Sequence, residues 1–435
     1  MTDNRGDGRR RRRLTATVTD LEVTRQRAYL VGVVMRTETV VDAEASLHEL
    51  GLLTDTAGSD PVEATLVRRD HPDPATLIGS GKVRDIVAAV KALDVDVVVF
   101  DNELTPAQQR NLTTRFEVDV VDRVALILDI FAQHATSREG MVQVELAQHR
   151  YRLPRLRGRG VELSRLGGGI GTRGPGETKL ETDRRRILER ISKLEGELRH
   201  LAKARATRSK ARLGSELALV SLVGYTNAGK STLFNAITDA GVLVEDQLFA
   251  TLDSTVRRTA LPDGRPVLLS DTVGFVRRLP HQLVEAFRST LEEVNQANLL
   301  LHVVDAADEN PDGQIEAVRT VLREIGASAL DELLVINKLD IADDTAVGRL
   351  LALHPGSVAV SAVSGEKLDE LLEVVAARLE GATIEVELVV PYPRGDVVSA
   401  IHDAGEVIAE EHVAAGTRLV VKLPKEEADR FSAYA

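Results

Sequence analysis

The residues whose types and spacing could perform chemistry begin with a glycine-rich stretch, Gly224-Tyr-Thr-Asn-Ala-Gly-Lys-Ser231. A glycine, four further residues and then Gly-Lys-Ser is the spacing of a phosphate-binding loop. The glycines let backbone N–H groups face phosphate oxygens, Lys230 would contact the β- and γ-phosphates, and the Ser231 hydroxyl would bind Mg²⁺. An apolar run precedes the stretch and a helical pattern follows it, as such a loop requires. The predicted phosphate-binding residues are Gly224, Tyr225, Thr226, Asn227, Ala228, Gly229, Lys230 and Ser231.

A second motif stands at the end of the apolar run that begins at Val267. Asp271 can hold the ligand shell of a Mg²⁺ ion, and the Gly274 N–H can reach a γ-phosphate. The pattern is weak alone because Asp and Gly end many strands, but it is informative at this separation from a phosphate-binding loop. The predicted residues of this motif are Asp271, Thr272, Val273 and Gly274.

A third motif indicates which base is bound. Guanine presents N1–H and a 2-amino group, whereas adenine presents a lone pair at N1 and has no 2-amino group, so the Asp340 carboxylate should bind guanine and repel adenine. We expect Asn337 to brace the loop and the base edge, the Lys338 stem to pack over the ring, and the Ala362 N–H to donate to guanine O6. The predicted guanine-binding residues are Asn337, Lys338, Asp340, Ser361, Ala362 and Val363. In this order the motifs predict binding of GTP and GDP.

The segment that senses the γ-phosphate must lie between residues 232 and 266. Thr251 is the best candidate there, since it would ligate Mg²⁺ and make the segment an order–disorder switch. Thr255 is a nearby alternative, and both threonines could instead only favour strand structure. The predicted switch residues are Phe249, Ala250, Thr251, Leu252 and Asp253.

The catalytic residues predicted from these motifs are Lys230, Thr251 and Gly274, with Ser231 and Thr251 as the Mg²⁺ ligands. Many small GTPases place a glutamine after the motif glycine to orient the attacking water, but this chain has Phe275 there. We therefore expect slow intrinsic hydrolysis that a partner or a cation completes. Asn227 occurs at its position in GTPases that recruit K⁺, so K⁺ is a candidate for that cation.

Composition sets limits on the rest of the chain. The 435 residues predict several domains, and the absence of cysteine excludes disulfides, thiolate metal sites and cysteine nucleophiles. No apolar run is long enough to span a bilayer and the start has no signal-peptide core, which predicts a cytoplasmic protein, expected to be a monomer. Residues 150–212 hold 19 Lys or Arg and 7 Asp or Glu, a charge of +12, while the remainder carries −24. This basic segment indicates an RNA partner or, equally, a solvated helical face.

The elements that must position these motifs belong to an α/β fold with several parts. Apolar runs such as 95–100 alternate with helical patterns between residues 27 and 136, which predicts a parallel sheet. Apolar residues then recur in a heptad pattern along a long helix from 181, after an irregular glycine run that extends to Lys179. We predict a disordered Arg-rich tail (1–24), an α/β domain (25–136), a basic helical coiled-coil hairpin with a glycine-rich loop (137–213), a P-loop GTPase domain (214–382) and a small α+β domain (383–435).

Several stretches together resemble the HflX family, which belongs to the translation-factor-related class of P-loop GTPases. They are the glycine run RLGGGIGTRGPGETKLE at 165–181, the helix start ETDRRRI, the loop GYTNAGKST, the switch LFATLD and the stretch DTVGFVRRLP. The glycine run followed by the arginine helix is the specific part, because the nucleotide motifs occur in many families. The resemblance extends from about residue 25 to the end of the chain.

The resemblance implies a function at the ribosome. HflX proteins bind mainly the large ribosomal subunit and its RNA, are stimulated there, and split stalled or hibernating ribosomes under stress, with GTP hydrolysis resetting the factor. It also implies a cytoplasmic location, including peripheral association with membrane-bound ribosomes. Some members bind ATP through the N-terminal domain, but the stretch 78–82 is too short to be a phosphate-binding motif. Two alternatives stay open: a guanine-nucleotide switch that acts through a protein partner, and a nucleotide-driven RNA-remodelling enzyme.

Overall fold

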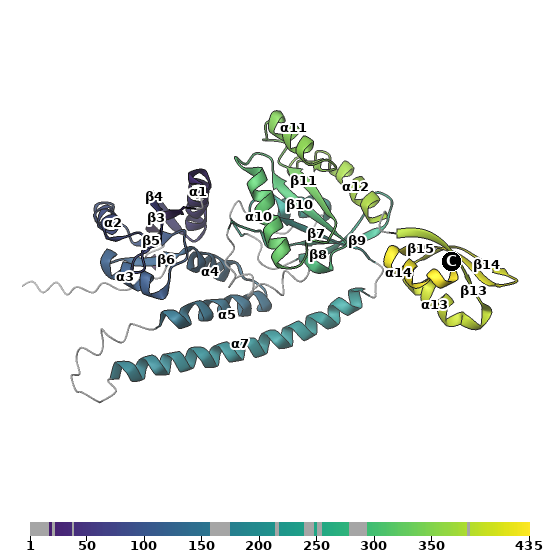
Figure 1. Ribbon diagram of the computed structural model, residues 1–435, viewed down its shortest axis with the longest axis horizontal. Coiled ribbons are helices and arrows are strands. Elements are labelled where there is room, and N and C mark those ends of the chain that lie inside the picture. Colours follow the sequence, from purple (N-terminus) through teal and green to yellow (C-terminus); the bar gives the residue numbers. More distant parts are fainter. Residues whose placement is uncertain are drawn as a thin grey trace, which may run out of the picture. The chain divides into compact units, whose positions relative to one another are not determined.

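The computed structural model has an α/β fold that divides into two compact units (Figure 1). It describes residues 17–19, 22–36, 39–156, 175–213, 217–238, 248–249, 255–277, 294–380 and 383–435. The first unit contains the described residues up to 204 together with 248–249 and 276–277, and the second contains the others. In the part of the chain that is described, no helix is long and apolar enough to cross a membrane.

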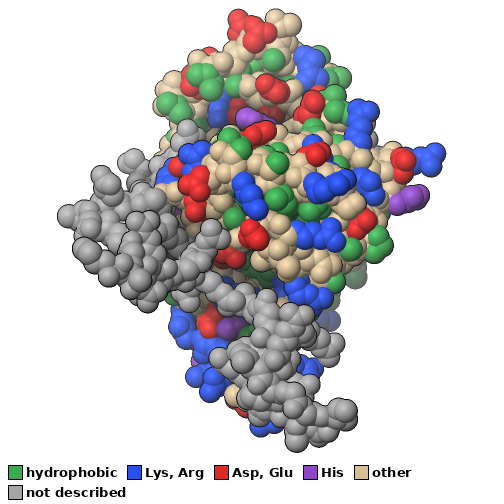
Figure 2. All heavy atoms as spheres, turned by 90° about the vertical axis from the view of Figure 1, so that its left-hand side faces the viewer, with side chains coloured by type: hydrophobic (Ala, Val, Ile, Leu, Met, Phe, Trp, Pro, Cys, Tyr) green, Lys and Arg blue, Asp and Glu red, His purple; other side chains and the backbone are tan. Residues whose placement is uncertain are grey.

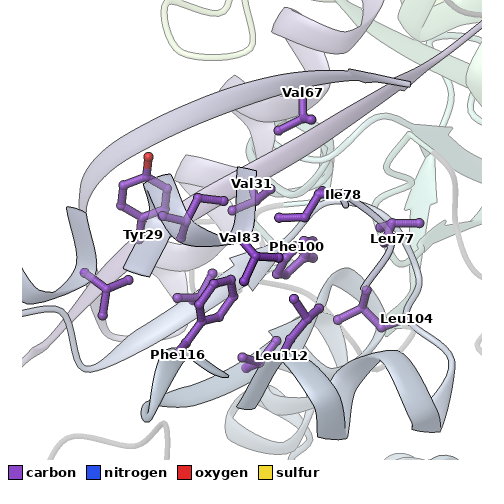
Figure 3. Close-up of a cluster of buried hydrophobic side chains, with 14 of the residues drawn as sticks. Tyr29, Val31, Val67, Leu77, Ile78, Val83, Phe100, Leu104, Leu112 and Phe116 are labelled. Carbon is purple, nitrogen blue, oxygen red and sulfur yellow. The ribbon is translucent and has the colours of Figure 1, made fainter. Parts of the chain in front are cut away.

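The first unit is built on a four-stranded parallel sheet in the order β4-β3-β5-β6. Buried apolar runs such as Val97–Phe100 form its inner strands, and Figure 3 shows Val31, Phe100 and Phe116 meeting in the core beside it. The elements are β3 (Gln26–Met35), α1 (Val40–Thr56), β4 (Ser59–Arg69), α2 (Ser80–Ala92), β5 (Val97–Phe100), α3 (Pro106–Phe116), β6 (Asp119–Asp122) and α4 (Arg123–His134), preceded by the antiparallel pair β1 (Thr17–Thr19) and β2 (Glu22–Thr24). The helix predicted to be capped by Thr105 is present with a full capping box.

Two helices follow the sheet and pack along each other: α5 (Arg138–Arg155) and α7 (Pro175–Leu213). The heptad residue Leu194 is fully buried against Val142 and Leu146 of α5, so the predicted apolar stripe of the long helix faces its neighbour. The prediction that irregular structure extends to Lys179 is wrong, because α7 already begins at Pro175. A proline suits the first turn of a helix, where its missing N–H is not needed. The glycine-rich part at 157–174 lies outside the described residues.

The second unit holds a six-stranded sheet in the order β12-β11-β10-β7-β9-β8, parallel except for the edge strand β8. Its elements are β7 (Leu219–Gly224), α8 (Lys230–Thr238), β8 (Thr255–Ala260), β9 (Pro266–Asp271), η1 (Val294–Gln296), β10 (Leu299–Asp305), α10 (Pro311–Glu324), β11 (Glu332–Asn337), α11 (Asp344–Leu353), β12 (Val358–Ala359) and α12 (Leu368–Glu380). Parallel strands end at one edge of a sheet, so β7, β9 and β11 deliver their three sequence motifs to the same edge.

The chain ends in a three-stranded antiparallel sheet in the order β13-β15-β14. Its elements are β13 (Thr383–Val390), η2 (Tyr392–Arg394), α13 (Gly395–Ala404), β14 (Glu406–Val413), β15 (Gly416–Pro424), α14 (Lys425–Arg430) and η3 (Ser432–Tyr434). Leu388, Leu419 and Ile401 form its core. The predicted α+β character of this part is present. The edge strand β14 has largely exposed side chains and so lacks the apolar alternation that marks a strand in a sequence.

Candidate active site

The phosphate-binding loop takes the shape that its glycines permit. Gly224 ends β7 with φ +153°, and a Cβ there would lie 2.3 Å from the Val303 carbonyl oxygen of the neighbouring strand. Gly229 has φ +90°, and a Cβ there would lie 2.3 Å from the Asn337 amide nitrogen. Both positions therefore require glycine, one because strands approach closely and the other because the loop turns against Asn337. Helix α8 starts at Lys230, which places the loop at a helix N-terminus.

Lys230 supplies a buried positive charge to this loop. Its side chain is 6% exposed and its Nζ donates to the Tyr225 carbonyl oxygen at 2.7 Å. Burial lowers the pKa of Lys230 to about 8, while the charge of Asp271 acts in the opposite direction. A nucleotide phosphate would supply the anion that a buried ammonium group needs.

Ser231 and Asp271 form the oxygen-rich side of the site. The Ser231 hydroxyl donates to the Asp271 carboxylate at 2.7 Å, and Asp271 is fully buried. Hydroxyl and carboxylate oxygens are the ligands that Mg²⁺ prefers, so this pair fits the predicted ion together with phosphate oxygens. Within the described ranges no group of three or more His, Asp or Glu side chains could hold a metal without such help.

The Asp-x-x-Gly segment lies directly against the phosphate-binding loop. A Cβ on Gly274 would be 2.8 Å from the Thr226 methyl carbon and 3.1 Å from Lys230 Nζ. Between them, the Thr272 hydroxyl donates to the Leu222 carbonyl oxygen at 2.6 Å and Val273 is buried. The predicted position of Gly274 beside the γ-phosphate is therefore compatible with the structure.

Phe275 has a structural role that the sequence does not reveal. Its N–H donates to the Gly224 carbonyl oxygen at 3.1 Å, and its own carbonyl oxygen accepts from the Thr226 N–H at 2.7 Å. Its ring is 1% exposed. The side chain thus faces the core, and the backbone joins the motif to the phosphate-binding loop.

Asn337 links the two loops expected to surround the nucleotide. Its amide nitrogen donates to the Ala228 carbonyl oxygen at 2.9 Å, and its amide oxygen accepts from the Ala362 N–H at 3.0 Å. This geometry is compatible with the predicted bracing of the loop, and the predicted contact of Asn337 with the base edge stays a prediction. The Ala362 N–H, predicted to donate to guanine O6, donates to Asn337 here, whereas Val363 is 77% exposed.

Asp340 and Lys338 are each held by a partner at the rim of the site. The Ser361 hydroxyl donates to the Asp340 carboxylate at 2.6 Å, and Asp340 is exposed. Lys338 adopts φ +70°, and its Nζ lies 2.7 Å from an Asp305 oxygen. No sequence motif marks Asp305, although it ends the apolar run of β10 just as Asp271 ends that of β9.

The predicted switch is only partly described. Phe249 is buried, and its ring meets Phe131 of α4 edge to face at a centroid distance of 4.7 Å, so the ring packs on the first unit's helix. Ala250, Thr251, Leu252 and Asp253 lie outside the described residues, and Thr251 stays a prediction. After the second motif, the Arg277 carbonyl oxygen accepts from the buried Arg123 at 3.0 Å.

Comparison with known proteins agrees with this geometry along most of the chain. Four family descriptions match: "GTP-binding GTPase N-terminal" at 44–132, "GTP-binding GTPase Middle Region" at 134–212, "50S ribosome-binding GTPase" at 219–338 and "HflX C-terminal domain" at 351–433. A GTP-binding protein of the archaeon Sulfolobus solfataricus, solved with GDP, aligns at 24% identity and a TM-score of 0.40 over 81% of this chain and 98% of that one, which is too low to support an argument.

Individual relatives are much more similar. The protein called GTPase HflX from Escherichia coli is 46% identical over 82% of this chain and 84% of its own length. The proteins of that name from Lacrimispora saccharolytica and Caldanaerobacter subterraneus are 45% and 44% identical, over 88% and 94% of this chain and 91% and 93% of their own lengths. These matches confirm the resemblance inferred from the motifs. The chain belongs to the HflX family of P-loop GTPases, and its reaction is the hydrolysis of GTP.

Proposed function

We propose that this GTPase binds the large ribosomal subunit through ribosomal RNA and splits stalled or hibernating ribosomes under stress in the cytoplasm. GTP binding drives the splitting, and hydrolysis resets the factor. The observation that carries the proposal is the match of residues 219–338 to a family described as a 50S ribosome-binding GTPase, in a chain that also has a basic helix.

The basic helix supports RNA as the contact. Arg184, Arg185 and Arg186 are exposed on α7, as are Lys193 and Arg199. Figure 2 shows one face of the molecule on which Lys and Arg side chains stand among acidic ones. Lys and Arg that neutralise phosphates release counterions, which makes such binding strong at low salt and weaker as salt rises.

The same helix argues against a protein partner bound through the coiled coil. The heptad stripe of α7 already packs on α5, with Leu194 fully buried between Val142 and Leu146. A second helix would have to displace α5 to reach that stripe. The polar, arginine-rich face is the one left for a ligand, and its charge favours an anion.

The nucleotide site would act as the switch. Mg²⁺ bound by Ser231 and Thr251 would neutralise part of the phosphate charge, and K⁺ beside Asn227 would neutralise more of it. Gly274 and the segment around Thr251 would contact the γ-phosphate of GTP and lose that contact in the GDP state. The GTP-bound and GDP-bound forms of the protein would therefore bind the ribosome with different affinities.

Co-sedimentation with purified large subunits tests the proposal, using a non-hydrolysable GTP analogue in one arm and GDP in the other. More protein should pellet with the analogue, and the GTPase rate should rise when ribosomes are added. Equal pelleting in both arms, or none, would defeat the splitting mechanism. Lys230→Ala should remove the nucleotide dependence because it removes the phosphate ligand.

A matched pair of charge reversals tests the RNA contact. Arg185→Glu changes the basic helix, and Arg115→Glu changes an exposed arginine of α3 outside it. The first should weaken ribosome binding and lower the slope of log affinity against log salt, and the second should do neither. Equal losses for both would mean that overall charge, not this helix, controls binding.

A further inference from the structure

The end of strand β10 lies between the two loops that are expected to hold the nucleotide. In the sheet, β10 has β7 on one side and β11 on the other (Figure 1). Strand β7 leads into the phosphate-binding loop, and β11 leads into the guanine-binding motif. The three strands are parallel, so their carboxyl ends lie at one edge of the sheet. The last residue of β10, Asp305, therefore lies between the expected positions of the phosphates and the base.

Asp305 holds the side chain of Lys338. One carboxylate oxygen lies 2.7 Å from Lys338 Nζ, and the two side chains are only 16% and 22% exposed. The other carboxylate oxygen accepts from the Ala307 N–H at 2.9 Å. Each oxygen thus has its own donor, which fixes the orientation of the carboxylate. A hydrogen bond between an ammonium group and a carboxylate is stronger than one between neutral groups.

The backbone around this pair is held in place without it. Asp305 is paired with Asn337 in the register of β10 and β11, and the Ala306 N–H donates to the Asn337 carbonyl oxygen at 3.0 Å. The Lys338 carbonyl oxygen accepts from the Ala342 N–H at 3.0 Å, which closes the turn of the guanine-binding motif. Removing the Asp305 carboxylate should therefore release the side chain of Lys338 and leave its backbone in position.

A released lysine side chain would lose conformational entropy each time a nucleotide bound beneath it. The stem is apolar and adopts many rotamers in water, and most of that freedom is lost when the stem packs on a flat ring. With Nζ held by Asp305, the stem spans the interval between the ends of β11 and β10 before the nucleotide arrives. Such preorganisation raises affinity because less entropy is lost on binding.

We propose that Asp305 is a positioning residue for the nucleotide: by holding Lys338 Nζ, it fixes the lysine stem over the guanine ring and slows the release of GDP and GTP alike. The proposal uses the predicted contact between the stem and the ring. It requires no ribosome, so it goes beyond the function proposed above. A stem over the face of the ring does not contact the base edge, so the choice of guanine stays with the predicted contacts of Asp340.

The test measures GDP affinity and GTP turnover in full-length variants. Asp305→Ala should weaken GDP binding about tenfold, mainly through faster release, because the stem must be ordered again on binding. The KM for GTP should rise by a similar factor, while single-turnover hydrolysis at saturating GTP should change less than about twofold, because the stem contacts the base and not the phosphates. Unchanged GDP affinity, or an equal loss in the saturated hydrolysis rate, would overturn the proposal.

Asp305→Asn keeps the acceptor for the Ala307 N–H and removes only the charge. It should fold even if Asp305→Ala does not, and it should weaken GDP binding about threefold, because a neutral hydrogen bond to Lys338 is weaker than a charged one. GDP affinity equal to that of the natural chain in this variant would contradict the positioning role.

A double-mutant cycle tests whether Asp305 acts through Lys338. Lys338→Met keeps an apolar stem of similar length and removes the ammonium group, so it should weaken GDP binding at least as much as Asp305→Ala. Adding Asp305→Ala to Lys338→Met should cause less than about a twofold further loss. A further loss of about tenfold would mean that Asp305 contacts the nucleotide itself, and the positioning role would be wrong. If Lys338→Met binds GDP normally, the stem does not contact the ring and the proposal fails, while ribosome binding is unaffected.

Asp331 provides a matched control in the same unit. Its carboxylate lies 2.7 Å from Arg378, and it directly precedes β11, at the opposite edge of the sheet from the nucleotide loops. Asp331→Ala should lower the free energy of unfolding about as much as Asp305→Ala and leave GDP affinity unchanged. Equal losses of GDP affinity in the two variants would mean that a general loss of charge or stability explains the effect.

Nucleotide analogues separate the face of the ring from the base edge and from the sugar. IDP lacks the 2-amino group of GDP but has the same purine face, so Asp305→Ala should weaken the binding of IDP and GDP by the same factor. A changed ratio of the two affinities would place the effect at the base edge and overturn the proposal. A penalty that disappears with 2′-deoxy-GDP would assign Asp305 to the sugar and overturn it as well.

Discussion

Replacing Asn337 with alanine tests whether the loops around the nucleotide are held together by one side chain. Asn337 is 2% exposed and makes two hydrogen bonds, to the Ala228 carbonyl oxygen at 2.9 Å and from the Ala362 N–H at 3.0 Å. A buried hydrogen bond contributes about 1 kcal/mol, so losing both costs about 2 kcal/mol. If the nucleotide must restore the loop geometry, this loss appears as roughly 30-fold weaker binding of GDP.

The chain offers a matched control in the other unit. Asn102 makes the same pair of backbone bonds, accepting from the Val33 N–H at 2.8 Å and donating to the Val33 carbonyl oxygen at 3.2 Å. Asn102→Ala should therefore lower the free energy of unfolding by a similar amount and leave GDP affinity unchanged. Equilibrium titration with a fluorescent GDP analogue and urea unfolding measure the two quantities. GDP affinity within threefold of the natural chain for Asn337→Ala would refute the bracing role.

Three further predictions follow from other buried groups. Burial lowers the pKa of Lys230 to about 8, and a bound phosphate should raise this pKa again, so nucleotide affinity should fall as pH rises above about 8. Calorimetry in buffers of different ionisation enthalpy should detect proton uptake on nucleotide binding above about pH 8. The Lys230→Met variant should show no such uptake. Burial also lowers the pKa of His302, so at low pH the folded state binds fewer protons than the unfolded state. The free energy of unfolding should therefore fall as pH drops below about 6.5, and it should fall less in the His302→Gln variant. Denaturant titrations at several pH values measure this difference. Phe275→Gln should not raise the single-turnover GTP hydrolysis rate, because the side chain faces the core, and it should cost about 3 kcal/mol of stability.

The sequence predicts which loops converge at the candidate nucleotide site, because its motifs are contiguous and each follows a strand. Gly224, Asp271 and Asn337 end parallel strands, so their convergence follows from the topology alone. Asp305 also ends a parallel strand, but no recognised motif follows that strand, so the sequence alone does not predict its role. In contrast, the hydrogen bond between Phe275 and Gly224 joins backbone atoms, so the residue types at these positions do not predict it.

The polar contacts of the first unit cannot be predicted from the sequence, because they join residues that are far apart in the chain. Asp122 and Arg155 are 33 residues apart, and their pairing depends on where α5 ends. Arg123 pairs with Glu49 at 3.0 Å and with Asp101 at 2.7 Å, again from three elements. An isolated charge in an amphipathic pattern is usually exposed, so neither burial nor partner could be inferred before the fold was known.

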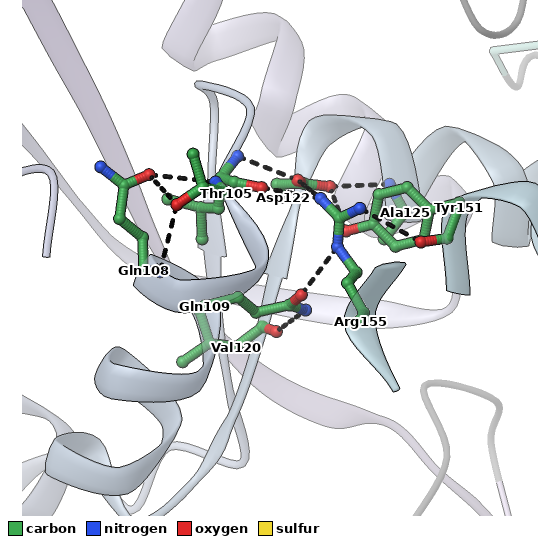
Figure 4. Close-up of polar contacts among 9 residues, drawn as sticks. Thr105, Gln108, Gln109, Val120, Asp122, Ala125, Tyr151 and Arg155 are labelled. Carbon is green, nitrogen blue, oxygen red and sulfur yellow. Dashed lines mark hydrogen bonds and ion pairs between the residues drawn. The ribbon is translucent and has the colours of Figure 1, made fainter. Parts of the chain in front are cut away.

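The two parallel sheets therefore use the same edge in opposite ways. In the second unit, glycines at 224 and 229 keep side chains away from the strand ends, which leaves backbone and Lys230 for phosphates. In the first unit, the corresponding edge is filled by Arg123 with its two carboxylates. Beside them, Asp122 accepts hydrogen bonds from Tyr151 and Arg155 (Figure 4). A phosphate at this edge would lie close to buried carboxylates and would have to separate them from their arginine partners. Breaking a buried ion pair in this way costs free energy. Among the described residues, the geometry thus assigns this edge of the N-terminal sheet to holding protein segments in place.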